Sequence, residues 1–463
     1  MDKKHFHFIA IGGAAMHNLA LALAAAGHVV TGSDDEINEP SRSRLLGAGL
    51  LPEHTGWFPE KINQGIHAII LGMHARNDNP ELMEAQRLGV PVFSYPEFLY
   101  NQSLNKLRVV IGGSHGKTTI TAMILHVLRY CGKEFDYMVG AKLAGFETMV
   151  KLSDAPVIVL EGDEYLSSPV DRRPKFHLYQ AQIAVISGIS WDHINVFPTF
   201  ENYVEQFRIF AGRLPADGKL IYCREDVTVA EVARSSATQA MKIPYGVPQH
   251  RIENGVTYIM HDGHETQVKV FGKHNLMNME AARLVCEQLA VSNADFFRAI
   301  SSFEGASRRL ELLEQNGTTA VYKDFAHSPS KLKATIDAVK DQFPERKLIA
   351  CMELHTFSSL NEAFLKEYRG AMEKADIAMV YFNPHTIAHK KLSPVSSYQV
   401  SEAFAKKDLM VFTDSGLMKL ELLEMNFEQS VVLLMSSGNF DGLSLEAIAL
   451  EIIQKSLTLT SNK

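Results

Sequence analysis

A glycine-rich stretch, Gly113-Ser-His-Gly-Lys-Thr118, constrains this 463-residue chain more than any other. It follows the apolar run Leu107–Ile111, which predicts a buried strand, and it precedes a helical run, Ile120–Tyr130, that Gly132 is placed to cap. Glycines between a strand and a helix let backbone N–H groups curl around a phosphate at the positive end of the helix. The sequence therefore predicts a phosphate-binding loop near the start of a second α/β domain.

The side chains of this loop suit a nucleoside triphosphate. Lys117 can reach the β- and γ-phosphate oxygens, and the hydroxyl of Thr118 can ligate Mg²⁺. The full GxxxxGK[ST] pattern needs glycine where this chain has Ile111, so the loop is a shorter variant, with a plain glycine turn as the alternative. The strand and helix on either side favour phosphate binding. The predicted ATP contacts here are Gly113, Ser114, His115, Gly116, Lys117, Thr118 and Thr119.

Polar residues also follow two further strand-like runs. Glu161-Gly-Asp-Glu164 follows Val157–Leu160, and Trp191-Asp192-His193 follows Ile183–Ile186. The carboxyl ends of strands are where open α/β sheets bind ligands, and Mg²⁺ takes one or two carboxylates together with phosphate oxygens. A solvated acidic loop and a structural histidine are the alternatives. Beside a P-loop we favour Thr118, Glu161 and His193 as metal ligands.

The first hundred residues predict another nucleotide-binding unit. An apolar run, His7–Ile11, meets Gly12-Gly13, and a helix over Ala14–Ala26 leads to a strand over His28–Thr31 and then to Gly32-Ser33-Asp34. Strand, glycine turn, helix, strand and acid outline a nucleotide-binding βαβ unit. The spacing is not GxGxxG, so a dinucleotide is not indicated, and any parallel α/β unit with a tight turn is the alternative.

Further runs complete a three-domain α/β chain. Strands expected at 68–71 and 91–93 extend the first domain over residues 1–105. The central P-loop domain is expected over 106–305, with hairpins at the turns 215–218, 253–255 and 261–263. A third, Rossmann-like domain is expected over 306–463, with strands at 321–325, 347–351, 377–381 and 431–435 and a helix at 331–339.

Composition excludes several classes of protein. Lys and Arg number 46 against 53 Asp and Glu, so a formal net charge of −7 argues against nucleic-acid binding. The longest apolar run near the N-terminus, Leu19–Ala26, is far shorter than the ~20 residues of a membrane span. The four scattered cysteines form no CxxC pair, which predicts free thiols in the cytoplasm. We expect no nucleic-acid or membrane partner, and the sequence carries no signal for an oligomeric state.

Three further motifs lie in the second half of the chain. Asn275 and Asn278 are three residues apart at the start of a predicted helix, so they share a face; helix capping is the alternative. Arg308-Arg309, near the expected junction with the third domain, can clamp phosphate or form a solvated pair. Lys323-Asp324 and His327 place an acid and an imidazole where a strand meets a loop.

Taken together, these stretches resemble the Mur ligase family, the ATP-dependent ligases of peptidoglycan synthesis. Six motifs match in order over more than 200 residues: Gly113–Thr119, Glu161–Glu164, Asp192–Asn195, Gly272–Asn278, Arg308–Arg309 and Asp324–Pro329. The resemblance implies an N-terminal UDP-binding domain, a central ATPase and a C-terminal domain. It implies ATP and Mg²⁺ as cofactors, UDP-N-acetylmuramate as a substrate and an acyl phosphate as the intermediate.

The resemblance also implies roles for single residues. Lys117 would bind the β/γ-phosphates, Thr118 and Glu161 one Mg²⁺, and His193 a second Mg²⁺; Lys117, Glu161 and His193 are the expected catalytic residues. Further ATP contacts would come from Asn275, Asn278, Arg309 and Asp324, with His327 orienting nucleotide or amine. The residues expected to bind the UDP-sugar are Gly12, Gly13, Ala14, Ala15, Met16, Ser33 and Asp34.

The most specific of these expectations concerns the identity of the acceptor amine. Three stretches, Glu161–Phe176, Arg308–His327 and Leu434–Gly442, resemble members that attach the recycled tripeptide L-Ala-γ-D-Glu-meso-diaminopimelate, so we expect a peptide acceptor. The stretch Glu353–Ser358 lacks the arginine of those members, and addition of L-alanine is the alternative. An inactive nucleotide-sugar sensor is a second alternative, while a dehydrogenase would leave the P-loop unexplained.

Overall fold

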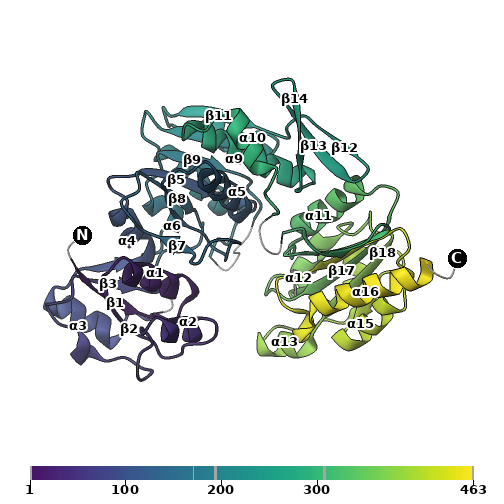
Figure 1. Cartoon of the computed structure of the whole chain (residues 1–463). Coiled ribbons are helices and arrows are strands. Elements are labelled where there is room, and N and C mark those ends of the chain that lie inside the picture. Colours follow the sequence, from purple (N-terminus) through teal and green to yellow (C-terminus); the bar gives the residue numbers. More distant parts are fainter. Residues whose placement is uncertain (1–2, 74, 170, 192–195, 306–308, 461–463) are drawn as a thin grey trace. The chain divides into compact units, whose positions relative to one another are not determined.

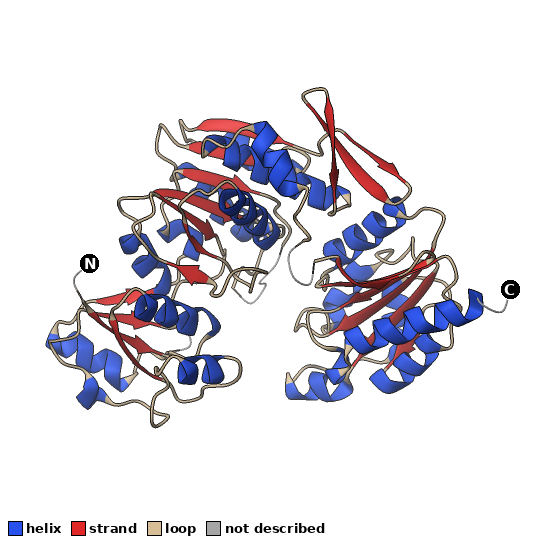
Figure 2. Ribbon diagram, in the orientation of Figure 1, coloured by secondary structure: helices blue, strands red, loops and turns tan. Residues whose placement is uncertain are grey.

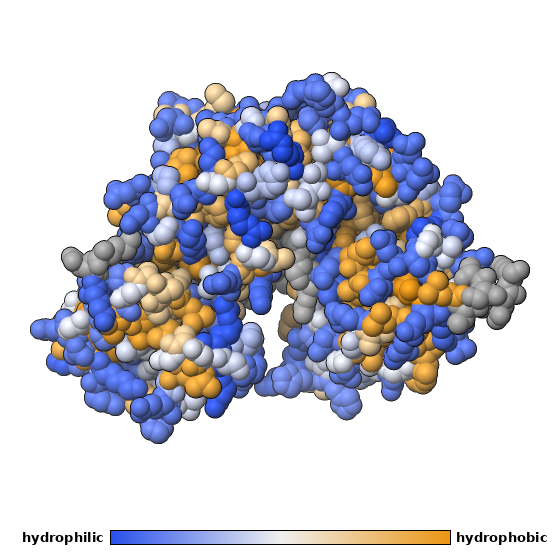
Figure 3. All heavy atoms as spheres, in the orientation of Figure 1, coloured by the Kyte–Doolittle hydropathy of each residue, from blue (hydrophilic) through white to orange (hydrophobic). Residues whose placement is uncertain are grey.

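The computed structural model describes residues 3–73, 75–169, 171–191, 196–305 and 309–460. The chain forms two compact units, one of Met1–Gly246 with Met277–Ile300 and the other of Val247–Leu276 with Ser301–Lys463. The chain therefore passes between the units at three points. Hydrophilic side chains cover most of the face shown in Figure 3, with apolar ones in separate patches. Among the described helices, none has the length and apolar character needed to cross a bilayer.

The first unit begins with a small parallel sheet. Its strands lie in the order β2 (Val29–Ser33), β1 (His5–Ile9), β3 (Ala68–Leu71) and β4 (Val92–Ser94). Strand β1 is the point at which the strand order reverses, which is where doubly wound sheets bind their ligands. The helices of this domain are α1 (Ala14–Ala25), α2 (Ser41–Gly47), η1 (Pro59–Lys61), α3 (Pro80–Leu88) and α4 (Tyr95–Gln102).

The second sheet of this unit has seven strands and carries the P-loop (Figure 1). Its order is β11 (Met241–Tyr245), β10 (Lys219–Cys223), β9 (Ile183–Ile186), β5 (Leu107–Gly112), β8 (Val157–Glu161), β6 (Asp136–Met138) and β7 (Val150–Lys151). All neighbours pair in parallel except β6 and β7. The helices are α5 (Lys117–Tyr130), α6 (Lys175–Leu178), α7 (Phe200–Gly212), α8 (Val227–Ser235), α9 (Lys273–Gln288), which starts in the other unit, and α10 (Asn293–Ile300).

Polar contacts from α1 and α2 help to join the N-terminal sheet's helices to the central domain. The backbone N–H of Met149 donates to Oδ1 of Asn18 on α1 at 3.2 Å. The guanidinium of Arg44 on α2 donates to the carbonyl of Glu147 at 3.4 Å and to Asn18 at 2.9 Å. The buried Asn18 therefore takes part in bonding the two domains of the first unit, together with Arg44 and with Tyr100 on α4, whose hydroxyl donates to Gln180 at 3.1 Å.

The second unit contains an antiparallel three-stranded sheet and a six-stranded sheet. The small sheet comprises β12 (His250–Glu253), β13 (Val256–His261) and β14 (His264–Val268). The large sheet has the order β15 (Glu311–Gln315), β16 (Thr319–Asp324), β20 (Ser430–Met435), β17 (Lys347–Leu354), β18 (Ile377–Phe382) and β19 (Met410–Phe412). Its helices are α11 (Pro329–Gln342), α12 (Glu362–Leu365), η2 (Lys366–Tyr368), α13 (Pro384–His389), α14 (Ser397–Phe404), α15 (Ser415–Leu423), η3 (Phe440–Gly442) and α16 (Leu445–Thr460).

Helices cover both faces of the six-stranded sheet (Figure 2). Alternate residues of β17 point to opposite faces, so Ala350 packs in the core beneath α11 and α14 while Ile349 packs in the core beneath α15 and α16. Burial on both faces explains why these strands are continuous apolar runs. The α/β fold class is therefore as expected from the sequence.

One expected hairpin is wrong and two are present. The turn 215–218 leads into β10, which pairs in parallel with β9, because a crossover helix rather than a turn joins these strands. The turns at Asn254-Gly255 and Asp262-Gly263 do join antiparallel strands, and all four residues have positive φ. Two consecutive left-handed residues match the twist of a tight hairpin, which explains the glycines there.

Candidate active site

The loops predicted to carry the chemistry leave three neighbouring parallel strands. Strand β5 lies between β8 and β9, so the P-loop that follows β5 is flanked by the loops that begin at Glu161 and Ser187. The carboxyl ends of these strands meet at one edge of the sheet. The motifs are therefore neighbours in space although more than 70 residues separate the first from the last.

Two glycines shape the P-loop. Gly113 has φ 135°, and a Cβ there would lie 2.2 Å from Oγ of Ser187. Gly116 has φ 81° at the N-terminus of α5, and a Cβ there would lie 2.5 Å from Oδ1 of Asn278. Both positions combine a left-handed backbone with a close neighbour, so only glycine fits.

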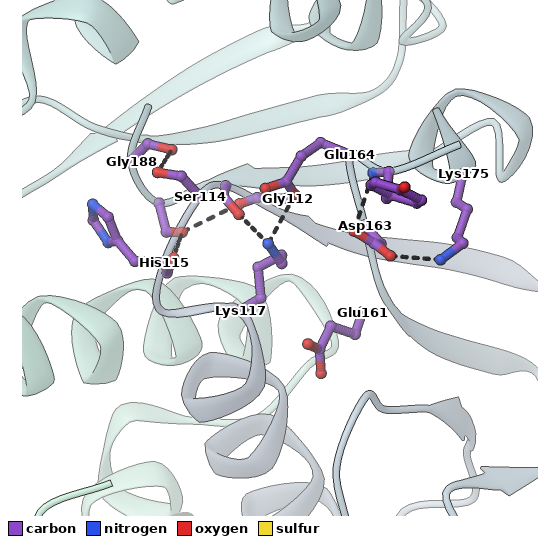
Figure 4. A network of polar contacts seen from close by, with 12 residues as sticks. Gly112, Ser114, His115, Lys117, Glu161, Asp163, Glu164, Lys175 and Gly188 are labelled. Carbon is purple, nitrogen blue, oxygen red and sulfur yellow. Dashed lines mark hydrogen bonds and ion pairs between the residues drawn. The ribbon is translucent and has the colours of Figure 1, made fainter. Parts of the chain in front are cut away.

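Hydroxyl groups hold the P-loop against the loop that follows β9 (Figure 4). Ser114 donates its hydroxyl to the carbonyl of Gly188 at 3.2 Å and accepts from the N–H of Ser190 at 2.8 Å. The hydroxyl of Ser187 contacts the carbonyl of His115. The imidazole of His115 takes the space that a Cβ on Gly188 would need. These contacts hold the P-loop in place against its neighbour.

Lys117 curls back over the loop that precedes it. Its ammonium donates to the carbonyl of Gly113 at 2.5 Å and to Oε2 of Glu164 at 2.8 Å. Burial alone would lower the pKa of Lys117, but the carboxylates of Glu164 and Asp163 outweigh burial, and the pKa lies above its ordinary value. The side chain is therefore a fixed cation at the N-terminal end of α5.

Thr118 and Glu161 form a pair that fits Mg²⁺. The Thr118 hydroxyl donates to Oε1 of Glu161 at 2.8 Å, and the other carboxylate oxygen accepts from the N–H of Gly140 at 2.8 Å. Burial raises the pKa of Glu161 above its ordinary value. Mg²⁺ commonly takes one or two protein oxygens and completes its shell with water and phosphate oxygens, so this donor set suits that ion. Within the described ranges, no three acidic, histidine or cysteine side chains gather into a metal site.

The remaining carboxylates of this loop are ion-paired. Asp163 lies 2.6 Å from the ammonium of Lys175 on α6. Burial acts to raise the pKa of Asp163, but the positive charges of Lys175 and Lys117 prevail and lower it to about 2. Glu164 is almost fully buried and also accepts from the hydroxyl of Tyr203 on α7 at 2.9 Å.

The two predicted asparagines sit on the first turns of α9. Asn278 reaches the P-loop, where its Oδ1 lies against Gly116. Asn275, in the other unit, donates to the carbonyl of Phe271 at 3.0 Å. In this bond the side-chain amide donates to a carbonyl four residues earlier, whereas a side chain that caps a helix N-terminus accepts from a backbone N–H, so Asn275 makes a local backbone contact that is not a helix cap.

Three predicted ATP contacts lie in the second unit around the end of β16. Asp324 is buried and its carboxylate accepts from the N–H groups of Leu310 and Ala326, both at 2.7 Å. The guanidinium of Arg309 lies over the ring of Phe325, 4.6 Å from its centroid. His327 bonds through Nδ1 to the carbonyl of Phe325 at 2.8 Å. The structure therefore brings these three residues together.

The predicted UDP-binding turn is held by its own acid. Oδ2 of Asp34 accepts from the N–H of Gly12 at 2.7 Å, and burial raises the pKa of this carboxyl. Ser33 is fully buried, and its carbonyl accepts from Ala10 and Ile11 at 2.9 and 3.2 Å, so it supports the turn from behind. At the start of α1, Gly13, Ala14, Ala15 and Met16 follow, with Ala14 and Ala15 exposed and Met16 buried. Because Ser33 and Met16 are buried, they would influence UDP binding by supporting the turn.

Some expectations fall outside the described residues. The residues concerned are His193, which was expected to hold the second metal ion, and also Asp192, Asn195 and Arg308. Sequence reasoning also missed residues. Ser187 could have been found, because it directly follows a buried strand beside the P-loop strand. Tyr203 gave no signal, since it is 39 residues from Glu164 on an ordinary amphipathic helix.

Comparisons with known proteins match this chain along most of its length. Residues 5–106 match the model described as "Mur ligase family, catalytic domain", 111–286 match "Mur ligase middle domain" and 308–438 match "Mur ligase, glutamate ligase domain". A UDP-N-acetylmuramate–L-alanine ligase from Sulfurihydrogenibium sp. is 29% identical over 95% of this chain and 96% of its own length. One from Rubrobacter xylanophilus is 30% identical over 81% and 83%.

Solved structures share the fold along the whole chain. A UDP-N-acetylmuramate–alanine ligase from Thermotoga maritima has a TM-score of 0.68 at 20% identity and covers 99% of this chain and 100% of its own. A murein peptide ligase from Psychrobacter arcticus has a TM-score of 0.62 at 22% identity and covers 99% of both.

These matches identify the chain as an ATP-dependent, ADP-forming ligase, and its P-loop domain with lysine, threonine and glutamate at one sheet edge is consistent with that class. The chain belongs to the Mur ligase family, the ligases of peptidoglycan synthesis. The resemblance inferred from its motifs is confirmed.

Proposed function

We propose that this enzyme joins the carboxylate of UDP-N-acetylmuramate to an amine, with ATP converted to ADP and phosphate. The observation that carries the proposal is the arrangement of Lys117, Thr118 and Glu161 at the carboxyl edge of the central sheet. The curated relatives are named for the same nucleotide sugar, and they span nearly the whole chain.

The chemistry follows from the substrate. A carboxylate is a poor electrophile because its leaving group would be oxide. A carboxylate oxygen attacks the γ-phosphorus of ATP, ADP leaves, and the acyl phosphate that forms has phosphate as its leaving group. The amine nitrogen then attacks the acyl carbon, the C–O bond to phosphate breaks, and the nitrogen loses a proton. Phosphoryl transfer needs positioning and charge neutralisation more than covalent help.

The residues divide this work. Lys117 and the P-loop N–H groups bind the phosphates, with Asn278 beside the loop. Thr118 and Glu161 would hold one Mg²⁺, which supplies charge neutralisation at the transferred phosphate, and His193 would help to hold a second. We further propose Asn275, Arg309, Asp324 and His327 as ATP contacts, Asp324 and His327 mainly by shaping the loop they hold.

The N-terminal turn would bind the UDP moiety. Gly12 to Met16 begin α1, whose first N–H groups lack intrahelical acceptors and favour a diphosphate. Asp34 keeps the turn in place through Gly12. The expected domain limits, 1–105, 106–305 and 306–463, assign this turn, the P-loop and the acceptor site to separate domains.

For the acceptor we propose L-alanine. Eight curated relatives that align with 79–95% of the chain at 27–30% identity are each named UDP-N-acetylmuramate–L-alanine ligase. Their agreement favours the alternative over the peptide acceptor that the C-terminal motifs predict.

The tripeptide remains the second candidate because of one loop of the second unit. The stretch after β20 that resembles tripeptide-attaching members is held around Glu353, which is buried. Its Oε2 accepts from the N–H of Phe440 at 2.8 Å and contacts the hydroxyl of Ser436. This loop lies at the carboxyl ends of β17 and β20, where a ligand of this domain would bind.

Phosphate release with Mg-ATP and UDP-N-acetylmuramate tests both candidates. Release with L-alanine alone would establish the proposed acceptor. Release with L-Ala-γ-D-Glu-meso-diaminopimelate alone would establish the tripeptide. No release with either amine would leave a nucleotide-sugar sensor as the function.

Lys117→Ala tests the phosphate site itself. We expect ADP formation to be lost, because the cation that neutralises the transferred phosphate is removed. Binding of the UDP-sugar, measured by calorimetry, should be unchanged since the N-terminal turn is intact. Turnover at the wild-type rate would contradict the assignment of the P-loop.

A further inference from the structure

A chain of two hydrogen bonds links Lys117 to a helix outside the predicted motifs. Lys117 donates to Oε2 of Glu164 at 2.8 Å, and Oε1 of Glu164 accepts from the hydroxyl of Tyr203 at 2.9 Å. Figure 4 shows Glu164 above the ammonium of Lys117, while Glu161 lies apart from it. The two glutamates of one loop therefore have different partners.

Glu164 is held rigidly. Its side chain is 1% exposed, and Tyr203 is fully buried. The ring of Tyr203 packs against Phe197 and Phe207, with centroids 5.4 and 5.3 Å apart. A buried ring between two others has little freedom, so its hydroxyl fixes the direction of the Glu164 carboxylate.

The lysine contacts leave one donor for a phosphate. An ammonium group has three N–H bonds, and among the described residues Gly113 and Glu164 accept two of them. The third is available without any movement of Lys117. An ammonium held by two acceptors loses less side-chain entropy when the phosphate binds than one on a mobile chain.

We propose that Glu164, oriented by Tyr203, is a positioning residue that fixes the ammonium of Lys117 over the P-loop, with its third N–H directed to the transferred phosphate. The inference rests on the proposed role of Lys117 as a phosphate ligand. It gives Glu164 a task separate from that of Glu161, which pairs with Thr118.

Substitutions at Glu164 grade the effect. Glu164→Ala removes the acceptor, and we expect kcat to fall roughly 10- to 100-fold, the cost of a misplaced catalytic group. The KM for UDP-N-acetylmuramate should stay at the wild-type value, because that substrate binds in another domain. Glu164→Gln keeps an acceptor oxygen and should restore part of kcat. Equal kcat for the Ala and Gln variants would contradict positioning by this hydrogen bond.

Tyr203→Phe tests the second link. We expect a smaller fall in kcat than for Glu164→Ala, and no further fall when both substitutions are combined, because Tyr203 acts through Glu164. Additive effects of the two substitutions would overturn this link.

Matched controls separate positioning from folding. Asp136→Asn breaks another buried ion pair of the central domain, in which Lys106 lies 2.8 Å from Asp136. Tyr137→Phe removes another buried hydroxyl, which donates to the carbonyl of Thr148 at 3.1 Å. Both should lower the unfolding midpoint and leave kcat per active site unchanged. A fall in kcat equal to that of the Glu164 and Tyr203 variants would overturn the proposal.

A measurement of nucleotide affinity tests the role of Glu164 independently of the proposed ligase reaction. If the wild type turns over with neither amine, the proposed function fails. The affinity for a fluorescent ATP analogue then tests the inference by itself. Its change on Glu164→Ala should vanish in the Lys117→Ala background, because Glu164 acts through Lys117. A change of the same size in both backgrounds would overturn the inference.

Discussion

At the scale of single residues, two positions of the P-loop have room and backbone conformation for glycine alone. Gly113 and Gly116 both have positive φ, and both face a polar atom closer than any real Cβ can approach. By contrast, Gly132 after α5 also has positive φ, at 65°, but a Cβ there would meet nothing within 4 Å. Substitutions at these glycines can therefore distinguish backbone strain, present at all three positions, from steric crowding, present only at Gly113 and Gly116.

Gly113→Ala should abolish turnover. The new methyl would sit 2.2 Å from Oγ of Ser187, so the loop must open where the phosphates bind. Gly132→Ala is the matched control: it carries only the left-handed strain of roughly 1 kcal/mol and should keep kcat. Measuring ADP formation for both distinguishes them, and an active Gly113→Ala enzyme would show that the loop tolerates a side chain there.

At the scale of elements, buried strands were predictable and edge strands were not. The runs Ala68–Leu71 and Ile183–Ile186 were predicted with the bounds of β3 and β9, because a central parallel strand is apolar throughout. Strand β11 contains Pro244 at the edge of its sheet, and β12 is mostly polar, so neither carries that signal. The wrong hairpin at 215–218 arose because a turn signal does not reveal strand direction.

The same distinction applies to the site. The loops after β5 and β8 were found because phosphate and metal chemistry demands particular residues at fixed spacing. The Lys117–Glu164–Tyr203 link could not be found, since hydrogen bonds between distant elements leave no periodic pattern. The tripeptide acceptor and the metal role of His193 stay predictions.

The packing of α6 on α7 predicts acid sensitivity. His177 is buried, and its Nε2 donates to the carbonyl of Gln206 at 2.8 Å. Burial lowers the pKa of His177 from 6.5 to about 4 although this hydrogen bond acts to raise it, so the imidazole is neutral near pH 7. The unfolded chain takes up this proton below pH 6.5 while the folded one does not, so stability falls as pH drops from about 6.5 to 4, by at most about 3 kcal/mol.

His177→Gln keeps a donor for Gln206 but does not titrate. We expect urea unfolding of the central domain to depend less on pH between 7 and 5 in this variant than in the wild type. Equal pH dependence in the two proteins would mean that another group is responsible.

At the scale of the whole molecule, the small sheet of β12 to β14 belongs to the second compact unit. The side chain of Gln342 on α11 accepts from the hydroxyl of Thr257 at 3.0 Å and donates to the carbonyl of Gly255 at 2.6 Å. The ring of Phe343 packs against Gly255. Gln342 therefore bonds α11 to the turn between β12 and β13 and to the start of β13.

Gln342→Ala should loosen this sheet. It leaves the buried hydroxyl of Thr257 unpaired, at a cost of about 1–3 kcal/mol. Hydrogen exchange should rise in residues 250–268, while nucleotide binding at the P-loop stays at the wild-type level. Asp341→Asn, at the exposed neighbouring position, is the control. Unchanged hydrogen exchange in the Gln342 variant would show that the hairpins are stable without this side chain.

The three passages of the chain between its compact units limit how the enzyme can be dissected. A fragment that starts at residue 301 lacks the hairpins that Gln342 holds, and one that ends at residue 246 lacks the half of α9 that carries Asn278. Neither cut yields a whole unit. To express the second unit alone, a gene would have to join residues 247–276 to residues 301–463. A single proteolytic cut cannot release this unit, because its two segments are separated in the sequence.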